Sequence, residues 1–175
     1  MRRKRKIEDG ERSVPDRERS RQRTMNRAVK LLAAKPRSEG ELRERLLEKP
    51  WTDREIVENV IRKLGEYKYV DDESFARQSA ISQLRQKPQG ERRLRFTMSR
   101  KKLSPENIDA AIAAAFEQMP ESELIETAIA KRIRLKGRPE SREELKKFYD
   151  HLLRQGFGFD LIREKLSRIG EISDE

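Results

Sequence analysis

Apolar residues recur along this chain with the spacing of amphipathic helices, and there is no strand-like alternation of useful length. One pattern of five apolar residues, spaced 4, 5, 5 and 4 positions apart, occurs three times at offsets of 52 and 54 residues. The three sets are Leu42, Leu46, Trp51, Ile56 and Val60; Leu94, Met98, Leu103, Ile108 and Ile112; and Phe148, Leu152, Phe157, Ile162 and Leu166. Fifteen residues on one template indicate an internal repeat.

Each set predicts two helices joined by a turn. The first two residues of a set fall on one face of a helix, and so do the last two. The middle residue, which is Trp51, Leu103 or Phe157, lies at the turn and can fill the angle between the helices. A further helix is predicted before each set, and these three helices span about residues 24–34, 72–87 and 121–136.

The repeating unit is therefore three helices long. We expect three-helix repeats at residues 24–70, 71–118 and 119–175, preceded by a tail at residues 1–23. Because only 34% of the residues are apolar and 42% are charged, a thick core is unfavourable. The predicted fold is all-α, an elongated array in which each helix buries one apolar stripe.

The composition also restricts where the protein works. Without cysteine the chain forms no disulfides and no thiolate metal site, which fits a reducing compartment. The longest apolar run, AAIAAAF at residues 110–116, is too short to span a membrane. No apolar segment follows the basic N-terminus, so a secretory signal is not expected. We expect a soluble cytoplasmic protein with no membrane partner.

The net charge of +10 is concentrated at the N-terminus. Residues 1–23 carry ten Lys/Arg and five Asp/Glu, hence half of the net charge, with almost no apolar content. Such a composition predicts disorder. The tail is either a solubilising extension or an auxiliary contact to a polyanion, and the sequence favours neither.

A stretch rich in aromatic and acidic residues, YKYVDDESFA at residues 67–76, joins the first two repeats. We expect Tyr67, Tyr69 and Val70 to close one helix, and Asp71 or Asp72 to cap the next, where a carboxylate accepts free backbone N–H groups. A catalytic or metal-binding pair of aspartates is the alternative. Adjacent acids at a predicted helix start favour the capping interpretation.

YVDDESFA, a helical Gly-x-Arg-Arg-Leu segment at 90–94 and the three degenerate repeats together resemble the RecX family of recombinase regulators, over about residues 24–170. The resemblance implies a curved, all-helical protein that binds the RecA filament on single-stranded DNA and restrains its ATPase, strand-exchange and coprotease activities. Two positions that are usually glycine in the family are Lys68 and Lys102 here. At these positions we expect the helices to run on or to cap differently.

No group of residues with catalytic spacing is found. The one histidine, His151, has no nearby Cys or His, and the chain lacks a phosphate-binding loop, a nucleophile turn and an H-E-x-x-H pair. Most carboxylates alternate with Arg or Lys at helical spacing, as in ELRERLLEK, which is typical of solvated faces. We therefore expect no enzyme activity, no cofactor, no metal and no small-molecule substrate.

Two basic clusters remain. KRIRLK at residues 131–136 ends a predicted helix, where cations are favoured by the helix dipole. Residues 85–102 carry eight Lys/Arg and one Glu, and several of these arginines lie near a helix start, where cations are disfavoured. We therefore take this second cluster as the candidate surface for DNA or a partner protein. Its residues are Arg85, Lys87, Arg92, Arg93, Arg95, Phe96, Arg100, Lys101 and Lys102.

Phe96 has a distinct role in this hypothesis. With Leu94 and Met98 facing inward, a helical step of about 100° per residue directs Phe96 outward between Arg92 and Arg100. There it could stack on a DNA base or fill a pocket on the recombinase. The alternative is that it packs on a neighbouring repeat.

Three functions fit these observations. The first is a monomeric regulator that docks on the RecA filament and on single-stranded DNA, with double-stranded DNA as a further partner. The second is a free-standing helical DNA-binding module without a recombinase partner. The third is an inert scaffold of helical repeats. The sequence gives neither the direction nor the strength of any regulatory effect.

Overall fold

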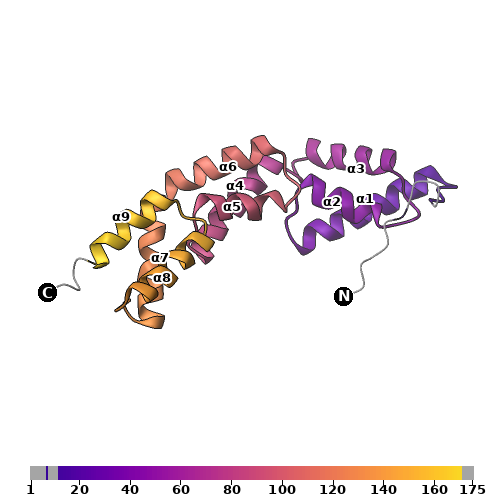
Figure 1. The fold of residues 1–175 in the computed structure, drawn as a ribbon. Helices are drawn as coiled ribbons and strands as arrows, with labels where there is room; N and C mark the ends of the chain where they lie inside the picture. Colours follow the sequence, from indigo (N-terminus) through magenta and orange to yellow (C-terminus); the bar gives the residue numbers. More distant parts are fainter. Residues whose placement is uncertain (1–6, 8–11, 171–175) are drawn as a thin grey trace. The chain divides into compact units, whose positions relative to one another are not determined.

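The computed structural model describes residue 7 and residues 12–170, and every regular element in this part of the chain is an α-helix. The helices follow one another in three groups of three, which confirms the predicted all-α fold and its tandem repeats (Figure 1). They are α1 (Arg17–Ala34), α2 (Glu39–Leu47), α3 (Arg54–Glu66), α4 (Asp72–Gln86), α5 (Glu91–Ser99), α6 (Pro105–Gln118), α7 (Glu121–Lys136), α8 (Arg142–Arg154) and α9 (Phe159–Gly170).

The helices pack within two compact units. Unit 1 comprises residues Met1–Phe75 and Lys101–Ser104, and unit 2 comprises Ala76–Arg100 and Pro105–Glu175. In unit 1, α1 packs against α2 and α3, which also pack against each other. In unit 2, α5 packs against α6, and α9 packs against both α7 and α8. Each unit therefore has a helical core of its own.

The repeat template describes these cores well. All of its apolar residues are buried except Trp51, which is half-buried. The Trp51 ring lies 4.5 Å below the Arg23 guanidinium, and the fully buried residue at this turn is Thr52. The position before Trp51 is Pro50, whereas the equivalent Lys102 and Gly156 have φ values of 58° and 90°. Proline fixes φ near −65°, so the first turn takes another path, and the prediction that Trp51 fills the angle between the helices is wrong.

The first helix begins earlier than the sequence predicts. α1 starts at Arg17, and the Asp16 carboxylate caps it by accepting from the Arg19 N–H at 2.9 Å. Ser20 and Thr24 are buried; Ser20 donates to the Trp51 carbonyl, and Thr24 bonds to Thr52. The prediction of a disordered tail is therefore wrong for residues 17–23, since small hydroxyl side chains form the inner face there. The prediction for residues 1–6 and 8–11 falls on a part of the tail that lies outside the described residues.

Lys68 and Lys102 take the backbone conformation that the resemblance assigns to glycine. Their φ values are 60° and 58°, in the left-handed region. At the end of α3, the Lys68 N–H donates to Gly65 O at 2.9 Å and the Tyr69 N–H donates to Leu64 O at 2.9 Å. This is the Schellman arrangement that ends many helices. The expectation that α3 runs on or caps differently is wrong, because lysine accepts the strained conformation.

The two aspartates of the YVDDESFA stretch have different roles. The Asp71 carboxylate accepts from the Ser74 N–H at 3.0 Å, as predicted for a cap of α4. The Asp72 carboxylate instead accepts from the N–H of Glu39, the first residue of α2, at 2.7 Å. Burial raises the pKa of Asp72 above its ordinary value. The second aspartate thus caps a helix of the preceding repeat.

This contact is one part of a junction that occurs twice. In unit 1, the start of α2 meets the α5–α6 turn: Ser38 Oγ donates to Lys101 O, and a Cβ on Gly40 would lie 2.4 Å from Lys102 O. Only glycine fits so close an approach. The turn therefore docks directly on main-chain atoms at the start of α2.

In unit 2, the start of α5 meets the α8–α9 turn in the same manner. The Gly90 N–H donates to Gln155 O at 3.0 Å, and a Cβ on Gly90 would lie 2.2 Å from Gly156 O. The carboxylate of Glu121, the first residue of α7, accepts from the Glu91 N–H at 3.2 Å. Burial raises the Glu121 pKa, as it does for Asp72. The two junctions use the same three elements: a carboxylate, a glycine and a turn carbonyl.

Candidate partner-binding surface

The predicted binding residues are divided between the two units. Arg85 is in the last turn of α4, Lys87 follows it, and Arg92, Arg93, Arg95 and Phe96 lie on α5, with Arg100 as its C-cap residue. All of these belong to unit 2, whereas Lys101 and Lys102 belong to unit 1. Seven of the nine predicted residues therefore lie in unit 2.

Helix α5 presents Phe96 to solvent. Leu94 and Met98 are fully buried and fix the orientation of the helix, and Phe96 on the other side is 65% exposed. The predicted outward direction is confirmed, and within unit 2 no neighbouring repeat covers the Phe96 side chain. Arg92 and Arg100, one turn away on either side, are exposed and form no ion pair within residues 12–170. We call Arg92, Phe96 and Arg100 the α5 face.

Two other α5 arginines are already engaged within the protein. Arg95 pairs with Asp109 and, at 3.0 Å, with Glu91, and these hydrogen bonds raise its pKa. Arg93 donates to the Arg154 carbonyl at 2.9 Å, at the end of α8. Cations at a helix C-terminus are favourable, so Arg93 helps to hold α5 and α8 together. The sequence analysis assigned Arg93 and Arg95 to partner binding, whereas these contacts give both side chains a role within the fold.

The remaining lysines of the cluster differ in availability. Lys101 Nζ lies 5.2 Å from the centre of the Phe75 ring, a cation–π contact inside unit 1. Lys87 and Lys102 are exposed. Lys102 also carries the strained backbone of the α5–α6 turn. Lys87 is therefore the lysine whose position suggests no structural role.

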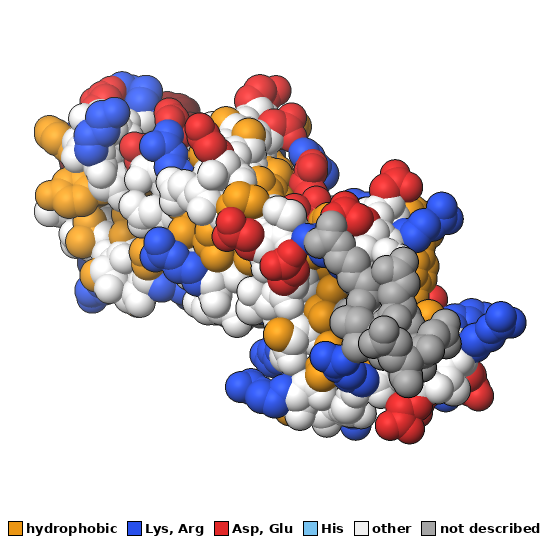
Figure 2. All heavy atoms as spheres, turned by 90° about the vertical axis from the view of Figure 1, so that its left-hand side faces the viewer, with side chains coloured by type: hydrophobic (Ala, Val, Ile, Leu, Met, Phe, Trp, Pro, Cys, Tyr) orange, Lys and Arg blue, Asp and Glu red, His pale blue; other side chains and the backbone are white. Residues whose placement is uncertain are grey.

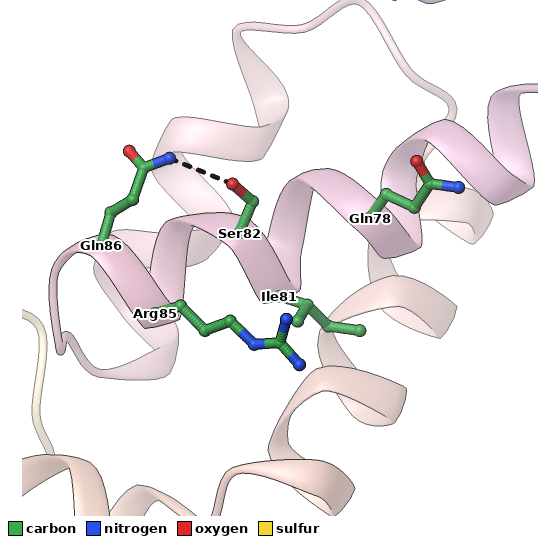
Figure 3. A pocket seen from close by; sticks show the side chains of 5 residues that line it. All are labelled: Gln78, Ile81, Ser82, Arg85 and Gln86. Carbon is green, nitrogen blue, oxygen red and sulfur yellow. Dashed lines mark hydrogen bonds between the residues drawn. The ribbon is translucent and has the colours of Figure 1, made fainter.

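Arg85 lines a shallow, open depression on α4 together with Gln78, Ile81, Ser82 and Gln86. Figure 3 shows Arg85 and Ile81 extending from one side of α4, while Gln86 and Ser82 are joined by a hydrogen bond of 3.1 Å. All five side chains come from a single helix. Small-molecule sites are usually enclosed and combine polar groups from several elements, so we assign no ligand to this depression.

The second basic cluster, at residues 131–136, fits its helix end. Arg134 and Lys136 are in the last turn of α7, where the dipole favours cations. The Arg132 guanidinium lies 5.1 Å from the Phe148 ring. His151, on the neighbouring α8, is half-buried, and burial followed by the charges of Arg132 and Arg154 lowers its pKa. Its environment therefore favours the neutral imidazole.

The sequence analysis missed a basic face on α1. This helix carries six Lys/Arg and one acid, Glu18. Arg17 and Arg21 are used in ion pairs, with Asp53 and Glu55 and with Glu18 respectively. Arg19, Arg23 and Lys30 are exposed, and we call these three the α1 basic face. The predicted helix began at residue 24 and so left out Arg19 and Arg23. A helical wheel that begins at residue 17 places both of them on the same side as Lys30.

One side of the protein carries mixed charge. On the side that Figure 2 shows, blue Lys and Arg side chains lie among red Asp and Glu side chains, and hydrophobic side chains reach the surface between them. Mixed surfaces favour solubility more than they favour one partner. The cations of the α5 face and the α1 basic face differ, because none of them forms an ion pair with another residue of the described part of the chain.

Three consecutive segments match models of the RecX family. They are the first three-helix domain at residues 25–64, the second at 71–112 and the third at 120–166. The chain belongs to the RecX family. The matched segments fall within the three predicted repeats, so the RecX resemblance that the sequence suggested is confirmed.

Relatives named regulatory protein RecX align with most of the chain. The protein of Chlorobium limicola is 36% identical over 149 residues, which is 85% of this chain and 90% of the relative. That of Thermotoga petrophila is 37% identical over 145 residues, 83% of each chain. The crystal structure of RecX from Lactobacillus salivarius has a TM-score of 0.73 at 18% identity, covering 90% of this chain and 98% of that one. This likeness confirms the RecX fold.

The relatives' shared name supports a regulatory role for the RecX-family chain. Among the helices that the structure describes, none is long and apolar enough to cross a bilayer.

Proposed function

We propose that this protein is a non-enzymatic regulator that binds the RecA nucleoprotein filament and inhibits its ATPase, strand-exchange and coprotease activities. It acts in the cytoplasm as a monomer and contacts both RecA and single-stranded DNA. Membership of the RecX family supports the choice of RecA as partner. The name of the relatives supports regulation, and the absence of spaced catalytic residues in the sequence favours action by binding.

The observation that carries the proposed interface is the exposed Phe96 between Arg92 and Arg100, which form no ion pair with the residues that the structure describes. A phenylalanine exposed to 65% gains free energy when a partner covers it. Stacking on a nucleic-acid base contributes about 1–3 kcal/mol, and arginines bind phosphate or carboxylate groups with two parallel hydrogen bonds. A filament that displays both phosphates and acidic side chains suits this combination.

The test is the DNA-dependent ATPase of RecA on single-stranded DNA, titrated with each variant. We expect Phe96→Ala, and separately Arg92→Gln with Arg100→Gln, to require at least about tenfold more protein for half-inhibition, equivalent to about 1.4 kcal/mol of lost binding. Circular dichroism should show unchanged helix content and melting temperature, because these side chains are exposed.

Two matched controls lie on other helices of unit 2. Leu135→Ala removes an apolar side chain that is 66% exposed on α7. Arg142→Gln with Lys146→Gln removes two exposed cations from α8. Both should inhibit like the parent protein. Equal inhibition by the α5 variants and by the controls would refute the α5 face, and no inhibition by the parent protein would refute the proposed function itself.

The α1 basic face favours a second candidate function, a DNA-binding module that works without RecA. Its exposed cations lie in unit 1, whereas the α5 face lies in unit 2. Co-sedimentation separates the two functions. Recovery with RecA-coated single-stranded DNA well above recovery with bare DNA supports the regulator, and equal recovery supports the free-standing module.

A further inference from the structure

The turn between α2 and α3 holds the guanidinium of Arg12. Arg12 Nη1 donates to Lys49 O at 3.1 Å and to Thr52 O at 3.0 Å, and Nη2 donates to Leu47 O at 3.0 Å. A further bond of 3.1 Å joins Nη2 to the carbonyl of Ile7. Leu47 is the last residue of α2, and the last carbonyls of a helix lack partners within the helix and carry the negative end of its dipole. Together with the turn carbonyls of Lys49 and Thr52, the Leu47 carbonyl is a suitable acceptor for a cation with several donors.

The same carbonyl position is occupied in every repeat. Counted two residues back from Trp51, Leu103 and Phe157, the acceptors are the carbonyls of Lys49, Lys101 and Gln155. In the second and third repeats the donors come from the start of the preceding middle helix, namely Ser38 and Gly90. In the first repeat the donor is Arg12.

Ser13, the residue after Arg12, also contacts the α2–α3 turn. The Ser13 N–H donates to Pro50 O at 3.0 Å, so the main chain also follows the turn. At this turn Pro50 prevents the left-handed conformation found at Lys102 and Gly156. A longer, branched donor is then needed to reach the carbonyls.

We propose that the carbonyl cluster of the α2–α3 turn, formed by Leu47, Lys49 and Thr52, is a guanidinium-binding site. Arg12 and Ser13 take there the place that the start of a middle helix takes at the other two turns. The start of α8, the third middle helix, is capped by side chains of its own first turn. Ser141 Oγ accepts from the Glu144 N–H at 3.2 Å, and the Glu144 carboxylate accepts from the Glu140 N–H at 2.9 Å. This arrangement, which is similar to a capping box, satisfies backbone N–H groups at the start of α8.

The experiment uses the single tryptophan of the chain, Trp51, which adjoins the site. Arg12→Lys keeps the charge but cannot present several donors in a plane. We expect this variant to change Trp51 fluorescence and to lower the melting temperature read from it by about 3–10 °C. The matched control, Arg19→Lys, changes an exposed arginine of α1 and should leave both readings unchanged. Parent-like fluorescence and melting of Arg12→Lys would overturn the proposal.

A second measurement tests the ligand class. The effect of methylguanidinium chloride is measured against that of methylammonium chloride at equal concentration, for Arg12→Ala and for the parent protein. The parent, with its site filled, reports the general denaturing effect of the guanidinium salt. We expect Arg12→Ala to be destabilised less than the parent by methylguanidinium, because only the guanidinium offers the planar set of donors that fills the vacated site. An equal difference between the two salts for both proteins would show that the carbonyl cluster does not bind a guanidinium. Neither experiment involves RecA, so their outcome is separate from that of the proposed function.

Discussion

Lys68 gives a quantitative test of how α3 ends. Its φ of 60° is left-handed, a conformation that costs an L-amino acid roughly 1–2 kcal/mol. Glycine avoids this cost but loses more conformational freedom on folding, roughly 0.5–1 kcal/mol. The Lys68 side chain is exposed, and its N–H keeps the bond to Gly65 O in either case. We therefore expect Lys68→Gly to raise the free energy of unfolding by about 0.5–1 kcal/mol.

Urea unfolding followed by Trp51 fluorescence measures this change, because the tryptophan and Lys68 belong to the same unit. The matched control is Lys63→Gly, the same substitution at an exposed position inside α3. It should lower the free energy of unfolding by about 1 kcal/mol, because glycine is a poor helix former. Opposite signs for the two variants are the expected result. If Lys68→Gly destabilises the protein as Lys63→Gly does, the left-handed backbone at Lys68 is not a source of strain.

Two further predictions concern charge. Burial raises the pKa of Asp72, so its contribution to stability is complete below the unfolded pKa of about 3.9 and is lost as the pH rises through the folded pKa. Asp72→Asn still offers an oxygen to the Glu39 N–H but cannot ionise. Its urea midpoint should therefore rise relative to that of the parent protein as the pH increases from about 4. A difference between the two midpoints that does not change with pH would contradict this. Replacing Arg19, Arg23 and Lys30 by Gln should reduce the slope of log K against log salt for duplex DNA by about 2–3, measured by fluorescence anisotropy, whereas an unchanged slope would mean that α1 does not contact phosphates.

The helices and their order could be predicted because their signals are local. Apolar residues at helical spacing define the inner faces, and an aspartate before a helix defines its start, as at Asp71. The start of α1 could not be predicted in this way. Its inner face uses Ser20 and Thr24, whose bonds reach 31 and 28 residues along the chain. A buried hydroxyl and an exposed one look the same in a sequence.

The candidate site shows the same division. The outward direction of Phe96 follows from two inward neighbours on its own helix. The engagement of Arg93 depends on a carbonyl 61 residues away, and that of Arg95 on an aspartate 14 residues away. Such partners are set by how helices pack, which local spacing does not show. The structure therefore narrows a basic cluster found by composition to the few side chains that remain available.

The junctions built on Gly40 and Gly90 bear on how repeats could be exchanged. At each one, the capping carboxylate, Asp72 or Glu121, accepts a bond from a main-chain N–H, and the turn supplies main-chain carbonyls. Because almost every group contacted is backbone, the fit depends little on side-chain identity across the joint. A chimera that takes its third repeat from a distant relative should fold if the glycine, the carboxylate and the turn are kept. The outer surfaces of the repeats are then free to diverge separately, each toward its own partner.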